Sequence, residues 1–166
     1  MKNLNQSKAK VLKYLIDKVN KFKIPKLISY TLEEISLLSR EELSRVLISE
    51  IGLCNIIVRS SAIDEDNNDF SKAGAYKSII GVKTDDLNSL WEATNDVINS
   101  YSTKNSFSKS NEIIFQKYIS NSSMSGVVFT HEMNFGAPYY VINYDDVSGL
   151  TDTVTSGNQY SNRTLY

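Results

Sequence analysis

The sequence has few of the residues that mark disulfide-bonded, metal-binding or membrane-spanning proteins. Its single cysteine, Cys54, cannot form an internal disulfide. Its one histidine, His131, has no accompanying cysteine or carboxylate cluster at metal-ligand spacing and no serine elbow before it, so we expect no chemistry there. No segment approaches the roughly 20 apolar residues that span a bilayer, and the first ten residues contain no apolar stretch of signal-peptide length. We therefore expect a cytoplasmic protein without a membrane partner.

The chain also lacks an excess of charge of either sign. Lysine and arginine number 18 and aspartate and glutamate 19 among 166 residues, so the formal net charge is −1. Such a balance gives no bulk attraction to nucleic acid, and the aromatic strands that could stack bases have few basic neighbours. We expect no nucleic-acid partner, and any anion site must be local. A hydrophobic content of 41% at this length indicates a globular protein with a core.

Helical and extended patterns alternate over the first hundred residues. Apolar residues at spacings of three and four predict an amphipathic helix over 8–22, with the inner positions Val11, Leu12, Leu15, Ile16 and Val19. Two further helices begin at Thr31 and Ser39, each followed three residues later by glutamate in a capping box, and Gly52 closes the second. The other predicted elements are an extended segment at 26–30, strands at 55–59 and 76–82, and a helix at 84–101 with Leu87, Leu90, Trp91, Val97 and Ile98 inward.

The second half of the chain is richer in strands. A polar connection at 102–111 precedes three short β-branched and aromatic runs, EIIFQKYI, SGVVFTHE and PYYVINYD. Their spacing predicts an antiparallel meander. The expected fold class is thus α+β, with mixed or antiparallel sheets flanked by helices. We expect residues 1–100 to form a first α/β lobe and residues 111–166 a strand-rich part.

Arg59 stands at the end of the predicted strand at 55–59 and is followed by two serines and an acidic loop. A guanidinium at a strand end can donate two parallel hydrogen bonds to phosphate oxygens. It can equally form a local ion pair with Glu65 or Asp66, and spacing alone leaves both interpretations open. Two weaker candidates are Lys8, at the start of the first helix, and the small-residue turn at Gly74.

Four blocks, VRSSAIDED, KAG, FQKYI and MSGVVFT, occur in that order. Together they resemble the nucleotide-binding domain of the phosphoenolpyruvate synthase and pyruvate phosphate dikinase family, most specifically over 58–74 and 116–130. The first helix with IPKLISYT, and the later GLTDTVTSG, resemble the outer elements of that domain. The resemblance favours a divergent member, similar to rifamycin phosphotransferases or glutamine kinases.

The resemblance implies an ATP-grasp fold and a set of nucleotide contacts. It assigns the phosphates of ATP to Lys8 and Arg59, with Arg59 also the catalytic residue. It assigns the loop that folds over the phosphates to Gly74 and Ala75. The edge that meets the adenine is assigned to Gln116, Lys117 and Tyr118.

The resemblance further implies that the chain is the amino-terminal part of an ATP-grasp domain within a longer enzyme. Magnesium is expected as a cofactor, with its ligands outside this chain. The whole enzyme would phosphorylate a histidine in a separate domain and pass the phosphate to pyruvate, an antibiotic or glutamine bound in an acceptor domain, releasing AMP and phosphate. This chain alone would then be inactive. The alternative is a non-catalytic interaction module that retains the ATP-grasp fold.

Overall fold

The computed structural model describes residues 7–62, 77–103, 107–132, 134–150, 153–154 and 162–166. The chain divides into two compact units, Met1–Tyr118 and Ile119–Tyr166, and each is described by itself. The fold is α+β with antiparallel sheets flanked by helices, which confirms the predicted class. No helix within the described residues is both long enough and apolar enough to cross a membrane.

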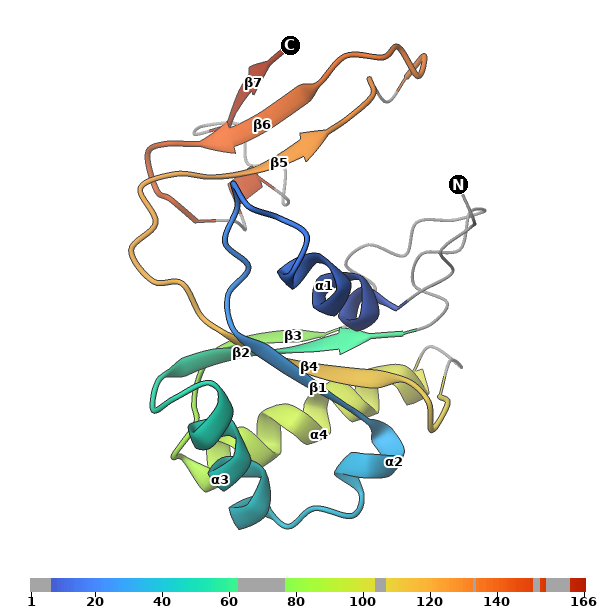
Figure 1. Ribbon diagram of the computed structural model, residues 1–166, viewed down its shortest axis with the longest axis vertical. Helices are drawn as coiled ribbons and strands as arrows, with labels where there is room; N and C mark the ends of the chain where they lie inside the picture. Colours follow the sequence, from blue (N-terminus) through green and yellow to red (C-terminus); the bar gives the residue numbers. More distant parts are fainter. Residues whose placement is uncertain (1–6, 63–76, 104–106, 133, 151–152, 155–161) are drawn as a thin grey trace. The chain divides into compact units, whose positions relative to one another are not determined.

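A four-stranded antiparallel sheet forms the centre of the first unit (Figure 1). Its strands, in the spatial order β1-β4-β2-β3, are β1 (Leu27–Thr31), β4 (Glu112–Lys117), β2 (Asn55–Ser61) and β3 (Ser78–Lys83). β4 lies between β1 and β2, and its first five residues are buried. A strand in this position has neighbours along both edges and is covered on both faces, which explains the run of apolar residues in EIIF.

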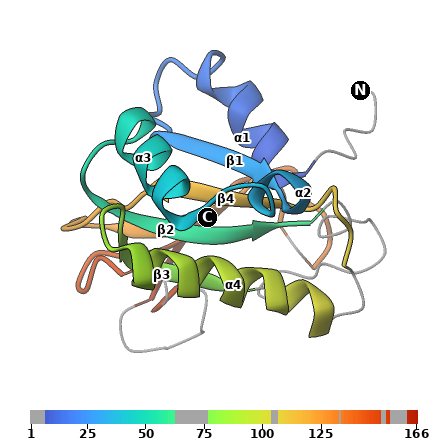
Figure 2. The same ribbon diagram turned by 90° about the horizontal axis from the view of Figure 1, so that it is seen from below.

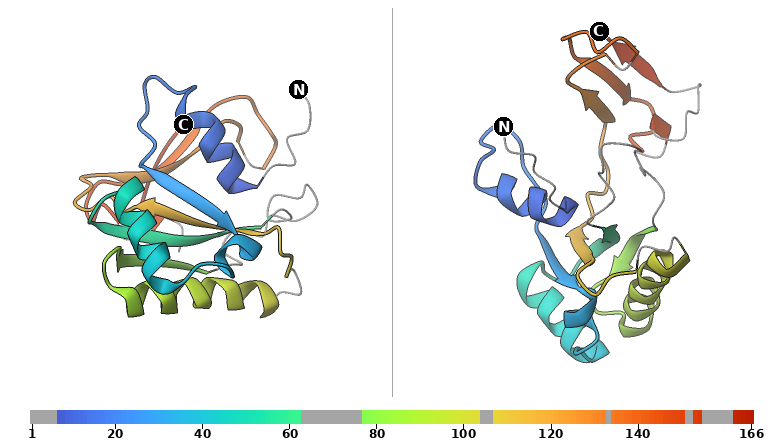
Figure 3. Two further views of the ribbon diagram at one scale, coloured as in Figure 1. Left: turned by 60° about the horizontal axis from the view of Figure 1, so that its bottom comes forward. Right: turned by 90° about the vertical axis from the view of Figure 1, so that its right-hand side faces the viewer.

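Helices cover both faces of this sheet. α1 (Lys8–Ile16) lies on one side, and α2 (Leu32–Ile35), α3 (Arg40–Glu50) and α4 (Leu87–Thr103) lie on the other (Figures 1 and 2). Figure 3 shows α1 and α4 on opposite sides of the strands. The hydrophobic core fills the space between the sheet and α2, α3 and α4. Its fully buried members include Leu43, Leu47, Ile56, Val58, Val97, Tyr101, Ile113 and Phe115.

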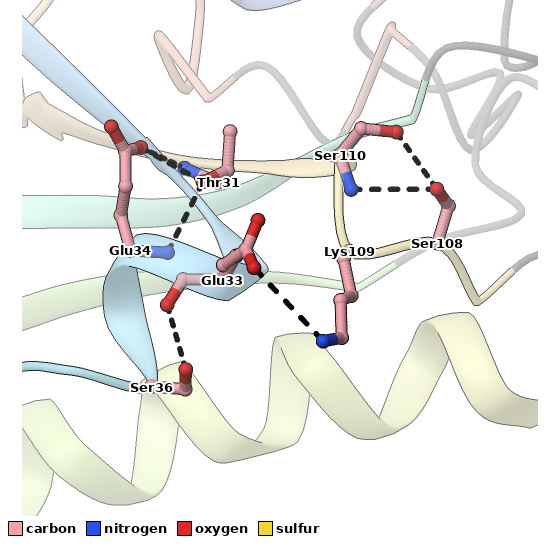
Figure 4. A network of polar contacts seen from close by, with 7 residues as sticks. All are labelled: Thr31, Glu33, Glu34, Ser36, Ser108, Lys109 and Ser110. Atoms are coloured by element: carbon pink, nitrogen blue, oxygen red, sulfur yellow. Dashed lines mark hydrogen bonds and ion pairs between the residues drawn. The ribbon is translucent and has the colours of Figure 1, made fainter.

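Capping boxes begin α2 and α3, as the sequence predicted. The Thr31 hydroxyl accepts from the Glu34 amide at 3.2 Å, and the Glu34 carboxylate accepts from the Thr31 amide at 2.7 Å (Figure 4). Ser39 and Glu42 make the same reciprocal pair at the start of α3. Gly52 follows α3 with φ of +113°, a conformation that glycine adopts without steric cost. The side-chain contacts confirm the predicted helix starts, and Gly52 confirms the predicted end of α3.

The first helix is shorter than predicted, and its expected inner positions are buried only in part. α1 ends at Ile16 instead of residue 22, because Asp17 caps it and the Lys18 amide donates to the Leu15 carbonyl in a tight turn. Its buried helical residue is Ala9, whereas Val11 and Ile16, expected to face inward, are exposed. Leu12, Leu15 and Val19, also expected to face inward, are partly buried, so the predicted stripe holds in part, and the closest contact with the sheet is at the amino-terminal turn of the helix.

The second unit contains a three-stranded antiparallel sheet. Its strands, in the order β5-β6-β7, are β5 (Ser125–Phe129), β6 (Val141–Asp145) and β7 (Arg163–Leu165). The predicted meander was therefore wrong in its first pairing. β4 pairs with β1 and β2 in the first unit, and β6 instead pairs with β5 and with β7, a strand that the pattern did not predict. Alternation of apolar residues shows that a strand exists but not which strand it pairs with.

Candidate functional site

Arg59 lies on the face of the first sheet that is turned away from the core. Its neighbour Val58 is fully buried in the core, and successive side chains of a strand point to opposite faces. Ser61, two residues after Arg59, accepts a hydrogen bond from the Ala9 amide of α1 at 2.9 Å. Arg59 and Ser61 therefore share the face covered by α1. The strand also extends through Ser61, so Arg59 lies two residues before its end rather than at its end as predicted.

Gln116 of β4 lies on the same face and contacts Arg59. Gln116 is paired in register with Ile57 of β2, and Ile57 lies two residues before Arg59 in that strand. The Arg59 Nη1 donates to Gln116 Oε1 at 3.4 Å, and the Gln116 side chain is buried. The structure thus brings together two residues that the family resemblance assigned to one nucleotide site. A guanidinium has five N–H donors, so the bond to this one neutral acceptor uses only one of those donors.

Lys8 is the first residue of α1, on the same side of the sheet. The residues on either side of it are both bonded to the strands: the Ser7 hydroxyl donates to Glu112 Oε2, and the Ala9 amide donates to Ser61 Oγ. Ser7 also caps the helix by accepting from the Lys10 amide at 3.4 Å. The backbone of Lys8 is therefore fixed relative to β2 and β4.

A buried polar network that the sequence did not reveal lies beneath this helix end. The Tyr101 hydroxyl of α4 donates to the Glu112 carbonyl at 2.6 Å and accepts from the Ser61 amide at 2.7 Å. Ser61 and Glu112 are register partners, so a side-chain hydroxyl bridges the two strands at this point. The clue available in the sequence was the helical spacing of Leu90, Val97 and Tyr101, which turns Tyr101 inward. A buried tyrosine hydroxyl requires a hydrogen-bond partner.

The backbone amides at the end of β4 are bonded within the protein. Lys117 N donates to the Lys26 carbonyl at 2.8 Å, and Tyr118 N donates to the Asn55 carbonyl at 2.9 Å. The Lys117 side chain is exposed and that of Tyr118 is partly buried. Of the segment assigned to the adenine, Gln116 faces Arg59, while these two residues lie at the strand end.

Other predicted positions lie outside the described residues. These are the phosphate loop at Gly74 and Ala75 and the acidic residues Glu65 and Asp66, which were the alternative partners of Arg59. Among the described residues, no group of three or more histidine, cysteine, aspartate or glutamate side chains is placed to hold a metal ion. His131 is exposed, and its Nδ1 lies 3.2 Å from the Thr130 hydroxyl.

A buried carboxylate organises the turn after β6 in the second unit. Asp145 accepts from the amides of Val147 and Ser148, both at 2.8 Å, and from the hydroxyls of Ser148 and Thr153, both at 2.6 Å. The hydrogen bond from the Ser148 hydroxyl, followed by that from Thr153, lowers the pKa of the Asp145 carboxyl well below its usual value. This turn leads into GLTDTVTSG, the block that resembles an outer element of the nucleotide-binding domain.

Gly149, the first residue of that block, lies against the preceding loop with φ of +66°. A Cβ added there would lie 2.0 Å from the carbonyl oxygen of Ser122. The Ser122 hydroxyl in turn donates to the Gly149 carbonyl at 2.6 Å. Both the conformation and the close approach of the two backbones therefore require glycine at this position.

Comparison with protein families identifies the family of this chain. A family model described as "Pyruvate phosphate dikinase, AMP/ATP-binding domain" matches residues 1–163. The chain belongs to this family. The match includes both compact units, and it confirms the family resemblance found from the sequence blocks. A search of curated proteins and a search of solved structures returned no significant match.

As an AMP/ATP-binding domain of the pyruvate phosphate dikinase family, the chain has a nucleotide as its ligand class. The match identifies the family and no subtype within it. The face of the first sheet beneath α1 holds Arg59 in contact with Gln116, and Lys8 begins the helix on the same side of the sheet. This face is the candidate nucleotide site.

Proposed function

We propose that this chain is the ATP-binding portion of a dikinase or phosphotransferase similar to phosphoenolpyruvate synthase, with an ATP-grasp fold. Lys8 and Arg59 hold the nucleotide phosphates, and Arg59 stabilises the charge of the transferred phosphoryl group. The observation that supports this most directly is the placement of Arg59 on the α1 face, bonded to a neutral amide. Phosphoryl transfer depends on positioned cations around the transferred group, which this arrangement supplies.

The proposed role of Arg59 follows from its chemistry and surroundings. Its contact with Gln116 orients the guanidinium and leaves its positive charge uncompensated by that partner. The contact with Gln116 takes one of the five N–H donors, and a planar guanidinium matches two oxygens of one phosphate group. Lys8 adds a second cation from the helix above, where the partial positive charge of a helix amino-terminus also favours an anion.

In the same proposal the adenine lies near the edge formed by Gln116, Lys117 and Tyr118, and the loop at Gly74 and Ala75 folds over the phosphates. The internal hydrogen bonds at the end of β4 restrict the adenine contacts. Because the amides of Lys117 and Tyr118 already donate to protein carbonyls, an adenine cannot accept from them without displacing those partners. The adenine would therefore use side chains or carbonyl oxygens of this segment.

The proposal extends to the reaction of the whole enzyme. With ATP and Mg²⁺, it phosphorylates a histidine in a separate domain, and the phosphate passes to a small acceptor such as pyruvate, an antibiotic or glutamine. The magnesium ligands and the acceptor site lie outside this chain, and we place the enzyme in the cytoplasm. Within the chain, residues 1–100 form the first lobe and 111–166 the strand-rich part of the ATP-grasp domain.

Calorimetric titration with ATP, ADP and AMP in the presence of Mg²⁺ tests the nucleotide assignment. Loss of a hydrogen bond to a charged phosphate costs about 1.5–3 kcal/mol, so Arg59→Ala should weaken ATP binding by about one to two decades. Arg40→Ala is the matched control, because Arg40 lies on α3 across the sheet, against Asn88 and Trp91. Equal effects of the two substitutions would contradict the role of Arg59.

The alternative, a non-catalytic interaction module that retains the ATP-grasp fold, predicts a different outcome. Such a module would show no ATP binding at millimolar nucleotide while remaining folded by circular dichroism. Binding of ATP that depends on Arg59 would exclude it.

A further inference from the structure

We propose that Glu112 and Ser61, supported by Tyr101, are positioning residues that hold Lys8 of α1 at the phosphate site. This inference rests on the proposed function, because it concerns how the cation assigned to the phosphates is placed. None of these three residues is assigned a direct contact with the nucleotide. They act through the helix end that they fix.

Glu112 supplies the first of two attachments for α1. It is the first residue of β4, on the same face as Arg59, and its side chain is buried. One carboxylate oxygen accepts from the Ser7 hydroxyl of the helix cap, and the other accepts from the Ser29 hydroxyl of β1 at 2.8 Å. A buried carboxylate requires such donors, and two hydroxyl groups therefore fix its orientation.

Ser61 supplies the second attachment. Its hydroxyl accepts from the Ala9 amide, one of the first amides of α1 that has no partner within the helix. Ser7, Ala9 and Ser61 are each at most 2% exposed, so water does not compete for these bonds. The two attachments are to the residues immediately before and after Lys8. The Cα position of Lys8 is thereby set by β2 and β4.

Tyr101 couples the two attachments. Its hydroxyl joins the backbone of Ser61 to the backbone of Glu112, so the strands that hold α1 are bridged by a residue of α4 from the opposite side of the sheet. The result is one continuous hydrogen-bonded chain from α4 through both strands to the start of α1. The same strand segment holds Arg59, two residues before Ser61.

Position matters for a lysine that binds phosphate. An ammonium group is a compact point charge on a flexible stem, so the geometry of its contact depends on where its backbone is held. Releasing the helix end would weaken the phosphate-dependent part of nucleotide binding. It would leave the binding of uncharged adenosine unchanged, because adenosine lacks the groups that Lys8 contacts.

A double-mutant cycle with Glu112→Gln and Lys8→Ala tests this inference by calorimetry with ATP and with adenosine. We expect Glu112→Gln to weaken ATP binding about five- to tenfold and to change adenosine binding less than twofold. In the Lys8→Ala background the same substitution should change ATP binding less than twofold, because it acts through Lys8. Equal losses in both backgrounds, or equal losses for ATP and adenosine, would overturn the positioning role.

Glu34→Gln is the matched control. It makes the same chemical change in another helix cap, at α2 on the opposite side of the sheet, and should leave ATP binding unchanged (Figure 4). Should Glu112→Gln fail to fold, Ser61→Ala replaces it in the cycle, since it removes one hydroxyl and the bond to Ala9 with the same expected pattern.

The failure of this inference is distinguishable from failure of the proposed function. A wild-type chain that binds no ATP refutes both. A wild-type chain that binds ATP in an Arg59-dependent manner, with no change on Glu112→Gln or Ser61→Ala, refutes the positioning role alone.

Amide hydrogen exchange at Ala9 and Lys10 gives a readout of the attachment of α1 without nucleotide. It should accelerate at least tenfold in both variants, and unchanged exchange would contradict the attachment of α1.

Discussion

Replacing Tyr101 by phenylalanine removes one hydroxyl from the centre of the network between the two faces of the sheet. The Ser61 amide then loses its acceptor and the Glu112 carbonyl its donor, and both residues are buried. An unsatisfied buried polar group costs about 1–3 kcal/mol. Because the partnered strands can approach each other and recover part of this loss, we expect destabilisation of the first unit by about 2 kcal/mol.

Urea unfolding followed by tryptophan fluorescence measures this effect. Trp91, the single tryptophan, lies in α4 and packs against the core of the first unit. With a denaturant slope of about 2 kcal/mol per molar, the unfolding midpoint should fall by about 1 M urea. Tyr14→Phe is the control, because Tyr14 is 60% exposed and should show no change. A change below about 0.5 kcal/mol for Tyr101→Phe would refute the bridging role of the hydroxyl.

Two further predictions concern the second unit. Gly149→Ala should destabilise this unit by about 2 kcal/mol or more, as measured by amide exchange in β6, because the new Cβ meets the Ser122 carbonyl. Gly136→Ala is the control, since Gly136 also has φ of +66° but lies in open space, and this substitution should cost only about 1 kcal/mol. Equal costs for the two substitutions would contradict the clash at Gly149. Asp145, whose pKa is lowered by its hydroxyl donors, should contribute stability that is complete above about pH 5 and is lost as the pH falls through its lowered pKa. Asp145→Asn should flatten that pH dependence of amide exchange, and an unchanged profile would contradict the assignment.

Local chemistry made a large part of the first unit predictable. The capping boxes at Thr31 and Ser39 define helix starts by contacts within three residues, so the sequence contains all the interacting groups. The apolar spacing of α4 similarly predicted that Leu90 and Val97 are buried. The convergence of Arg59 with Gln116 came from family resemblance, since nothing in their spacing of 57 residues indicates that the two side chains meet.

The features that were missed depend on contacts between distant segments. β4 was expected to pair with the strands that follow it, but it lies between β1 and β2, because a buried strand is placed by its neighbours in the sheet rather than by its own pattern. The full burial of Ala9 at the start of α1 was missed for the same reason. Its position is set by Glu112 and Ser61, which are polar residues of strands far along the chain.

The most direct test of the proposed nucleotide site is an amide chemical-shift titration of the chain with ATP and Mg²⁺. We predict that the largest shifts occur at the start of α1, residues 8–10, and along β2 at residues 59–61, with further shifts at Gln116. Amides of α3 across the sheet should remain unchanged. Shifts confined to α3 or to the second unit, or no shifts at millimolar ATP, would contradict the claim that Arg59 and Lys8 bind the nucleotide phosphates.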